Sequence, residues 1–177
     1  MTGAPVFATA PGIVLPQLGV APVLETVTVC EPGDDEVLVR IVAAGICHTD
    51  YGYMQYARAT PVLLGHEAAG VVERVGARVH HVHPGDHVVV NWQPKCGKCP
   101  RCLSGRRDLC EDIQATAAPR VFWRNEPLHV MLNAGAFCSY VVVPSRGAAK
   151  MRSDMPLEKA ALLGCAVATG VGPAPYP

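Results

Sequence analysis

Four cysteines stand close together in a segment that has no hydrophobic periodicity. Cys96, Cys99, Cys102 and Cys110 follow the spacing C-x2-C-x2-C-x7-C. Thiolates at these intervals suit a closed tetrahedral zinc site, because structural zinc is held by four sulfur or nitrogen ligands. Metal binding would also supply folding free energy to a loop that cannot build a core of its own. The segment 94–112 therefore predicts a protruding loop with a structural zinc.

Three other interpretations of the cysteine segment stay open at this point. The thiols could be unliganded surface cysteines. They could hold an iron–sulfur cluster, since C-x2-C-x2-C also opens the ferredoxin run, although its fourth cysteine normally comes three residues later. A zinc-ribbon-like nucleic-acid module is supported only by the Lys and Arg residues nearby. The net charge of the chain argues against a nucleic-acid module, because 15 Lys and Arg balance 15 Asp and Glu. Polyanion binding needs clustered positive charge.

A second candidate metal site is dispersed along the chain. Cys47 opens the run Cys-His-Thr-Asp after a predicted strand, His66-Glu67 comes before another, and Cys165 lies in a predicted late helix. Spacing alone cannot unite positions so far apart. Each cysteine could be an ordinary buried thiol, and His66 could be a hydrogen-bonded core histidine. From the residues alone, a shared metal site is a hypothesis.

The elements that would position these groups are mainly β-strands. Patterns rich in β-branched residues predict strands at 23–29, 36–42, 70–75, 79–82, 87–90 and 137–143. Helical turns are predicted at 46–54, and a late helix that contains Cys165 is predicted from Pro156, since proline suits a helix start. Residues 1–22 are expected to form an extended segment broken by prolines. The predicted fold class is therefore mainly β with short helices.

Length and composition limit the class of protein. A chain of 177 residues fits about one domain, and 50% hydrophobic with 17% charged residues excludes global disorder. No apolar run is long enough to span a membrane. The first 24 residues carry no charge, so a secretory signal is not expected. We expect a cytoplasmic protein, in which closely spaced cysteines bind metal more often than they form disulfides.

Several motifs together resemble the zinc-dependent medium-chain alcohol dehydrogenases. They occur in that family's order and cover roughly residues 23–172, at 47–50, 65–72, 84–89, the four-cysteine loop and 164–165. The resemblance implies a GroES-like catalytic domain, a partly open β-barrel with the zinc loop 94–112. Asn91-Trp92 and the run 162–165 are similar to the branch of thiol-dependent formaldehyde dehydrogenases, including mycothiol-dependent ones.

The resemblance also implies a ligand set for a catalytic zinc. Cys47, His66 and Cys165 would hold the metal and leave a fourth position for water or substrate. Glu67 would be the nearby carboxylate that can approach the metal. Asp50 would accept the free N–H of His66 and so fix its tautomer.

Further roles around the metal are implied in the same way. Thr49 would accept the alcohol proton and begin a relay, and His48 would face the cofactor pyrophosphate, where other members carry Arg. Trp92 would form one wall of the substrate pocket, and Thr169 would lie beside the nicotinamide. Many members carry a histidine where this chain has Gly52, so a relay beyond Thr49 would need another group or water.

The implied reaction is hydride transfer between NAD(P) and a small primary alcohol, or an S-hydroxymethyl thiol adduct. The implied cofactors are two zinc ions per chain and NAD(P). The partners would be a small alcohol or aldehyde and further copies of the chain, with no nucleic acid or membrane. Residues 173–177 read as a tail, and no G-x-G-x-x-G follows a strand. We therefore expect that the Rossmann domain is absent and that the isolated chain binds zinc but oxidises alcohols poorly.

Overall fold

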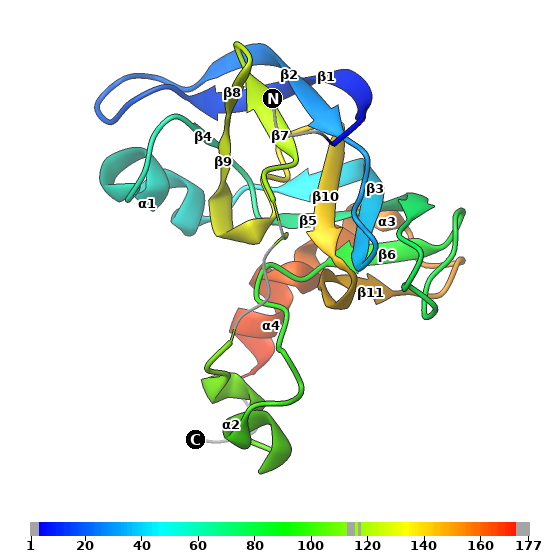
Figure 1. Ribbon diagram of the computed structural model, residues 1–177. Helices are drawn as coiled ribbons and strands as arrows, with labels where there is room; N and C mark the ends of the chain where they lie inside the picture. The colour runs from blue at the N-terminus through cyan, green and yellow to red at the C-terminus, as the bar shows by residue number, and fades with distance from the viewer. Residues whose placement is uncertain (1–3, 113–115, 117, 173–177) are drawn as a thin grey trace.

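Two sheets form the body of the computed structural model, which describes residues 4–112, 116 and 118–172 (Figure 1). The 6-stranded sheet runs in the order β8 (Glu126–Pro127), β7 (Val121–Trp123), β2 (Val23–Cys30), β1 (Val6–Leu15), β4 (Val62–Leu63) and β9 (His129–Val130). The 5-stranded sheet runs β10 (Tyr140–Pro144), β3 (Glu36–Gly45), β5 (Glu67–Val75), β6 (His87–Val90) and β11 (Ala148–Lys150). Neighbouring strands are antiparallel except β4 and β9, which are parallel.

The helices are short. They are α1 (His48–Tyr56), α2 (Pro100–Leu103), α3 (Leu157–Ala160) and α4 (Ala166–Val171). Single 3-10 turns occur at Arg107–Leu109, Met131–Asn133, Ser145–Gly147 and Ala161–Gly164. In the part of the chain that the structure describes, no helix is long and apolar enough to cross a membrane. The predicted fold class, mainly β with short helices and a protruding loop, is confirmed.

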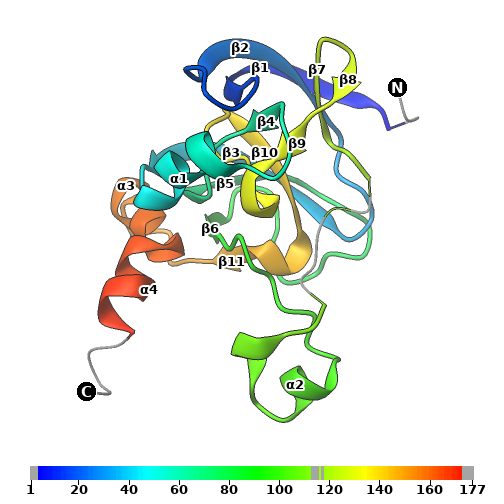
Figure 2. The same ribbon diagram turned by 90° about the vertical axis from the view of Figure 1, so that its left-hand side faces the viewer.

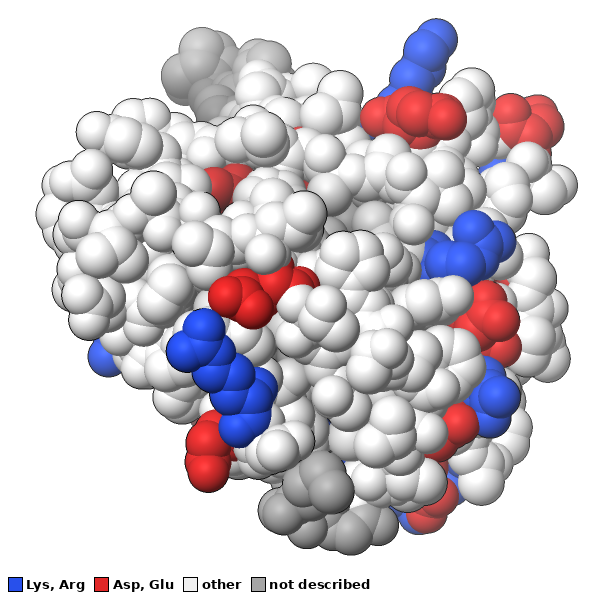
Figure 3. Space-filling view, turned by 90° about the horizontal axis from the view of Figure 1, so that it is seen from above, with Lys and Arg blue, Asp and Glu red and all other residues white. Residues whose placement is uncertain are grey.

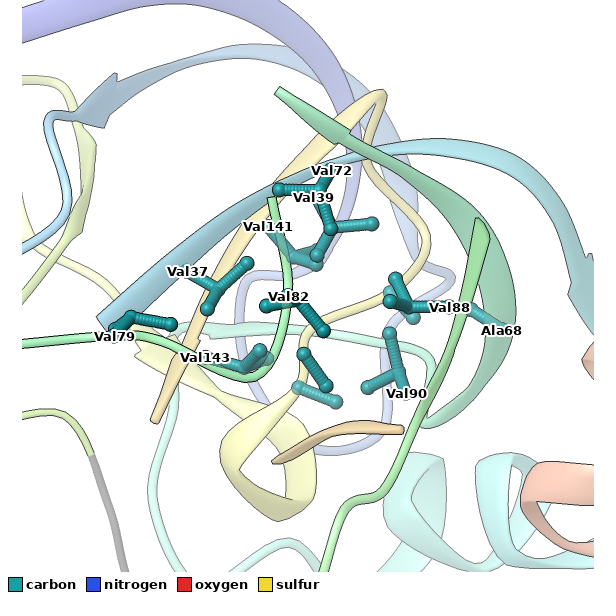
Figure 4. Packing of buried hydrophobic residues seen from close by; sticks show 13 residues of the cluster. Val37, Val39, Ala68, Val72, Val79, Val82, Val88, Val90, Val141 and Val143 are labelled. Atoms are coloured by element: carbon teal, nitrogen blue, oxygen red, sulfur yellow. The ribbon is translucent and has the colours of Figure 1, made fainter. Parts of the chain in front are cut away.

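The first half of strand β3, residues 36–39, is buried on both of its faces, which explains the consecutive apolar residues 37–39. Successive side chains of a strand point to opposite faces. Val37 and Val39 therefore pack into the valine-rich cluster of the 5-stranded sheet (Figure 4), whereas Leu38 packs with residues of β1, β2 and β4. All three side chains are fully buried. The buried part of β3 thus lies between the two sheets and packs into the hydrophobic cluster on each side.

Two of the predicted elements are wrong in detail. Residues 79–82 are a loop and not a strand; Val79 and Val82 are buried, so their apolar character reflects packing against the core. The late helix is interrupted: α3 passes into a 3-10 turn, and Cys165 has φ −148° and ψ −68° before α4 begins. Cys165 therefore lies at a break between helical segments and not inside one helix.

The N-terminal segment contains a regular strand that its prolines seemed to forbid. Strand β1 passes through Pro11, which pairs with Thr26 of β2. The carbonyl oxygen of Pro11 accepts from the Ser139 N–H, so that edge faces away from β2. Because the N–H and C=O of one strand residue point the same way, the missing N–H of Pro11 removes no bond from the β1–β2 ladder.

Two surfaces of the body differ strongly in character. A lobe that contains α2 extends from the end of β6 and hangs below the sheets in Figures 1 and 2. At the opposite end, β1 and β2 expose apolar side chains such as Val6 and Leu24. Seen from above, Figure 3 shows a broad area there without charged residues. Lys, Arg, Asp and Glu residues border this area on the same face.

We predict that Leu38→Ala destabilises the chain by about 2–5 kcal/mol, because it leaves a cavity between the two sheets. The matched control is Leu24→Ala on β2, where the side chain is 74% exposed, and there we expect a change within about 0.5 kcal/mol. Urea unfolding of the zinc-loaded variants measures both. Equal losses of unfolding free energy in the two variants would contradict the packing of Leu38 between the two sheets.

Candidate metal centres

The first centre begins at the N-terminal cap of helix α1. Cys47 has an extended backbone, and its Sγ accepts a hydrogen bond from the Thr49 N–H at 3.2 Å. In return, the Asp50 carboxylate accepts from the Cys47 N–H at 2.8 Å. This reciprocal capping satisfies N–H groups that a helix end leaves unpaired. It also fixes the direction in which the Cys47 sulfur points.

Asp50 connects this cap to His66. Its second carboxylate oxygen lies 3.2 Å from His66 Nδ1, and both side chains are buried, with 0% and 1% exposed. With Nδ1 donating to Asp50, the His66 Nε2 presents its lone pair to the centre, where it lies 3.3 Å from Cys47 Sγ. This is the arrangement in which a carboxylate selects the tautomer of a metal-binding imidazole.

A glycine turn brings His66 to this point at the start of β5. Gly65 has φ +93°, a conformation that side chains with a Cβ rarely adopt. A Cβ there would also collide with the backbone of Phe137, whose N–H donates to the Leu64 carbonyl at 2.9 Å. The backbone at Leu64 and Gly65 therefore lies in close contact with the backbone of Phe137, and only a glycine at position 65 permits this contact.

Glu67 joins the centre to the break at Cys165. Its carboxylate is buried and accepts from the Ala166 N–H at 3.1 Å. On its other side, a Cβ at Gly45 would come within 2.8 Å of the carboxylate carbon. The backbone turn at Cys165 leaves its Sγ 4.0 Å from Cys47 Sγ. Residues more than a hundred positions apart thus meet through one buried carboxylate and one interrupted helix.

The donor atoms fit a single tetrahedral ion. Zinc–sulfur bonds of about 2.3 Å place two sulfurs of such a site about 3.8 Å apart, close to the 4.0 Å between the two cysteines. One donor atom from each of Cys47, His66, Glu67 and Cys165 lies within 4.8 Å of the others. Two sulfurs, one imidazole nitrogen and a carboxylate are groups that zinc prefers.

The protonation of these donors is set by their neighbours. Burial raises the pKa of the Cys47 thiol, but the hydrogen bonds from Thr49 and the nearby His66 outweigh it, and the pKa falls below its ordinary value. Burial, with Cys47 beside it, raises the pKa of Cys165. Burial lowers the pKa of His66, yet the hydrogen bond and charge of Asp50 outweigh this and leave it raised. The polypeptide thus favours a thiolate at Cys47.

Other residues singled out in the sequence surround this cluster. The Trp92 ring stands edge-on to His66, with centroids 6.3 Å apart. Thr169 donates its N–H to the Cys165 carbonyl at 2.9 Å. His48 and Thr49 line a hollow of about 350 Å³ along α1, together with Gly52, Tyr53, Tyr56 and Arg58. Trp92 thus lies beside His66 and Thr169 beside Cys165, while His48 and Thr49, which directly follow Cys47, line the hollow along α1.

Sequence reasoning missed several positioning residues. Gly45 and Gly65 permit the close packing at Glu67 and His66, and a glycine beside a histidine was the available signal for Gly65. Asn133 donates to the Trp92 carbonyl at 3.4 Å, and Tyr53 and Tyr56 line the hollow along α1. No sequence pattern connects Asn133 with Trp92, because the two lie 41 positions apart.

The second centre lies in the lobe. Cys96 Sγ is 4.0 Å from Cys102 Sγ and 3.6 Å from Cys110 Sγ, and the donor atoms of all four cysteines, Cys99 included, lie within 4.8 Å of one another. These separations match one tetrahedral zinc ion. A cluster of several irons and inorganic sulfides would need its thiolates further apart, since they must surround it. The geometry favours a single ion.

Backbone N–H groups of the lobe point at these sulfurs. Cys96 Sγ accepts from the N–H of Lys98 at 3.4 Å and of Cys99 at 3.3 Å. Hydrogen bonds from the backbone of Glu111 and Cys102 lower the pKa of Cys99 to about 6. Burial raises the pKa of Cys102 to about 12. The loop backbone therefore favours a thiolate at Cys99, the form in which cysteine binds a metal, whereas burial disfavours one at Cys102.

We predict that the chain binds two zinc ions and that its variants lose them selectively. Cys102→Ser and Cys165→Ser should each reduce the zinc content by about one ion, because each removes a thiolate from a different cluster. Cys138→Ser is the control, a buried thiol outside both clusters, and should retain both ions. Elemental analysis after gel filtration measures the metal. Iron with visible charge-transfer absorption, or equal loss in all three variants, would contradict the assignment.

Comparison with known proteins agrees with this architecture. Residues 33–153 match the family model described as "Alcohol dehydrogenase GroES-like domain". The class-3 alcohol dehydrogenase of Pisum sativum is 37% identical over 161 residues, which are 84% of this chain and 43% of that protein. The S-(hydroxymethyl)glutathione dehydrogenase of Paracoccus denitrificans is 39% identical over 153 residues, 80% of this chain and 41% of that protein.

A solved structure shows the same fold. An alcohol dehydrogenase zinc-binding domain protein from Burkholderia ambifaria superposes with a TM-score of 0.87 at 34% identity, covering 96% of this chain and 49% of that one. The chain thus spans less than half the length of the proteins it matches. The order of motifs, the two sheets with their lobe and the matched family model agree: the chain belongs to the zinc-dependent alcohol dehydrogenase family and carries its GroES-like domain.

Proposed function

We propose that this chain provides the zinc-binding, substrate-binding part of an alcohol dehydrogenase that exchanges hydride between NAD(P) and a small primary alcohol or an S-hydroxymethyl thiol adduct. The observation that carries the proposal is the convergence of the donor atoms of Cys47, His66 and Cys165. His48 and Thr49, which directly follow Cys47, line a hollow that could take a small molecule. A zinc ion bound there supplies Lewis acidity, which favours loss of the proton from an alcohol near neutral pH. The second zinc of the proposal belongs to the four cysteines of the lobe.

The residues around the centre have separate roles in the proposal. Asp50 holds the proton at His66 Nδ1, so that Nε2 keeps a lone pair for the metal. Thr49 is exposed on the first turn of α1, where its hydroxyl can accept the alcohol proton and pass it to water. Gly52 offers no side chain to continue that route. The Trp92 ring beside His66 narrows the space for substrate and excludes water.

Glu67 is proposed to act close to the metal ligands and not on the substrate. Its carboxylate already accepts from the Ala166 N–H, so its charge helps to hold the helical break that carries Cys165. His48 lies next along the hollow of α1 and is proposed to contact the cofactor's pyrophosphate, with Thr169 beside the nicotinamide. The thiol-adduct substrate is supported by the similarity to the S-(hydroxymethyl)glutathione dehydrogenase of Paracoccus denitrificans.

We predict that the cobalt-substituted chain responds to a small alcohol at the Cys47–Cys165 centre. Cobalt(II) in place of zinc has visible absorption that depends on its ligands. Ethanol, or formaldehyde mixed with a thiol, should shift these bands in the unaltered chain and in Cys102→Ser. Cys165→Ser, which alters the other cluster, should not respond. A response that survives in Cys165→Ser but disappears in Cys102→Ser would contradict the proposal.

Steady-state turnover provides a second test. The 177 residues contain no G-x-G-x-x-G after a strand, so we expect this chain alone to reduce NAD well below the typical enzyme range of about 1–10³ s⁻¹. The measurement is NADH absorbance with ethanol or the formaldehyde–thiol adduct. A rate within that range would show that the chain needs no further dinucleotide-binding segment and would overturn this part of the proposal.

A further inference from the structure

A basic hollow lies between the lobe and the last strand of the 5-stranded sheet. Its volume is about 670 Å³, within the range of small-molecule sites. Its cationic lining comes from three parts of the chain: Arg78 after β5, Lys95 and Arg107 in the lobe, and Arg146 and Lys150 around β11. Within the part of the chain that the structure describes, no Asp or Glu lines it, although the whole chain contains 15 of them. None of the metal-binding residues belongs to it.

Two of these cations are neutralised by carboxylates outside the hollow. Arg78 bonds to both Asp34 and Asp35, with one contact to Asp34 of 2.9 Å. Lys150 lies 2.7 Å from a carboxylate oxygen of Asp86. These pairs fix two sides of the hollow, but they contribute little net positive charge to it.

The other three cations have no such compensation. Among the described residues, no carboxylate lies within ion-pair distance of Lys95, Arg107 or Arg146. Their neighbours in the lobe differ in this respect, since Lys98 pairs with Asp112 and Arg106 with Asp108. Three uncompensated charges around one concavity repel each other, and a bound anion would relieve that repulsion.

The hollow also has fixed geometry. One guanidinium nitrogen of Arg146 contacts the Lys95 carbonyl at 3.5 Å, which places this arginine against the base of the lobe. His81 Nε2 lies 3.3 Å from the Ala148 carbonyl and ties the 79–82 loop to β11. Asn91 and Ser145 add neutral polar groups to the lining. Hydrogen bonds therefore link the segment of Lys95 to Arg146, and the 79–82 loop to β11.

We propose that this hollow binds a phosphate-bearing small molecule, and that Lys95, Arg107 and Arg146 hold its phosphate. Guanidinium groups match phosphate oxygens with paired hydrogen bonds, and lysine adds a point charge. The volume leaves room for an organic group beyond the phosphate, with Asn91 and Ser145 available to its hydroxyls. The site is independent of the proposed alcohol centre, because no residue is common to both.

The test is an NMR titration of the zinc-loaded chain in chloride buffer of constant ionic strength. Inorganic phosphate and glycerol 3-phosphate are the probes, and the Arg107 and Arg146 Nε–H signals are followed. We expect saturable shifts with both probes and at least fivefold weaker binding in Arg107→Gln and Lys95→Gln. Tighter binding of glycerol 3-phosphate would identify a phosphate ester as the ligand, and equal binding would identify free phosphate.

Matched variants separate this site from general charge effects. Arg106→Gln and Lys98→Gln remove the same charges from the same lobe, but neither residue lines the hollow, and both should bind within about twofold of the unaltered chain. Cys165→Ser should also retain binding, which distinguishes the hollow from the alcohol centre. Zinc content confirms that each lobe variant is intact. Equal weakening in Arg106→Gln and Arg107→Gln, equal response to succinate, or no saturable shift would overturn the proposal.

Discussion

The buried Asp50 carboxylate is the interaction on which the arrangement of the first metal centre depends. One oxygen accepts from the Cys47 N–H and the other faces His66 Nδ1. A carboxylate with 0% of its side chain exposed is costly unless it is fully hydrogen-bonded, and here its partners are the backbone of one proposed ligand and the ring of another. The same bonds that satisfy the buried charge therefore set the cap of α1, the tautomer of His66 and the separation of the two donors.

The body and the lobe obtain their order by different means. In the body, the first half of β3 is buried on both faces and joins two hydrophobic clusters, and β5 is held by pairing with β3. Residues 94–112 of the lobe contribute nothing to these two clusters. The short helix and the 3-10 turn of the lobe are arranged around four sulfurs. Its order would come largely from the metal. The basic hollow lies where these two parts meet, which is why its lining combines lobe cations with those of β11.

Much of the fold was predictable because local patterns and burial agree. The run 36–42 reads as a strand and lies in β3, and the cysteine spacing alone located the lobe. The errors arose where tertiary contacts override pattern. Val79 and Val82 are apolar because the core needs them, although their backbone is a loop. Cys165 lies at a break that Glu67 helps to hold through Ala166, a contact across 99 positions that no periodicity encodes. Spacing alone therefore did not show whether Cys47, His66 and Cys165 form one site, and only the family resemblance implied that they do.

We propose that Cys47, His66 and Cys165 hold one zinc ion while the four lobe cysteines hold another. Anomalous diffraction from crystals of the zinc-loaded chain, recorded on both sides of the zinc absorption edge, tests it most directly. We expect two zinc peaks per chain, one bounded by Cys47 Sγ, His66 Nε2 and Cys165 Sγ and one inside the lobe. A peak in the lobe alone, with a Cys47–Cys165 disulfide or no density at the first centre, would contradict it.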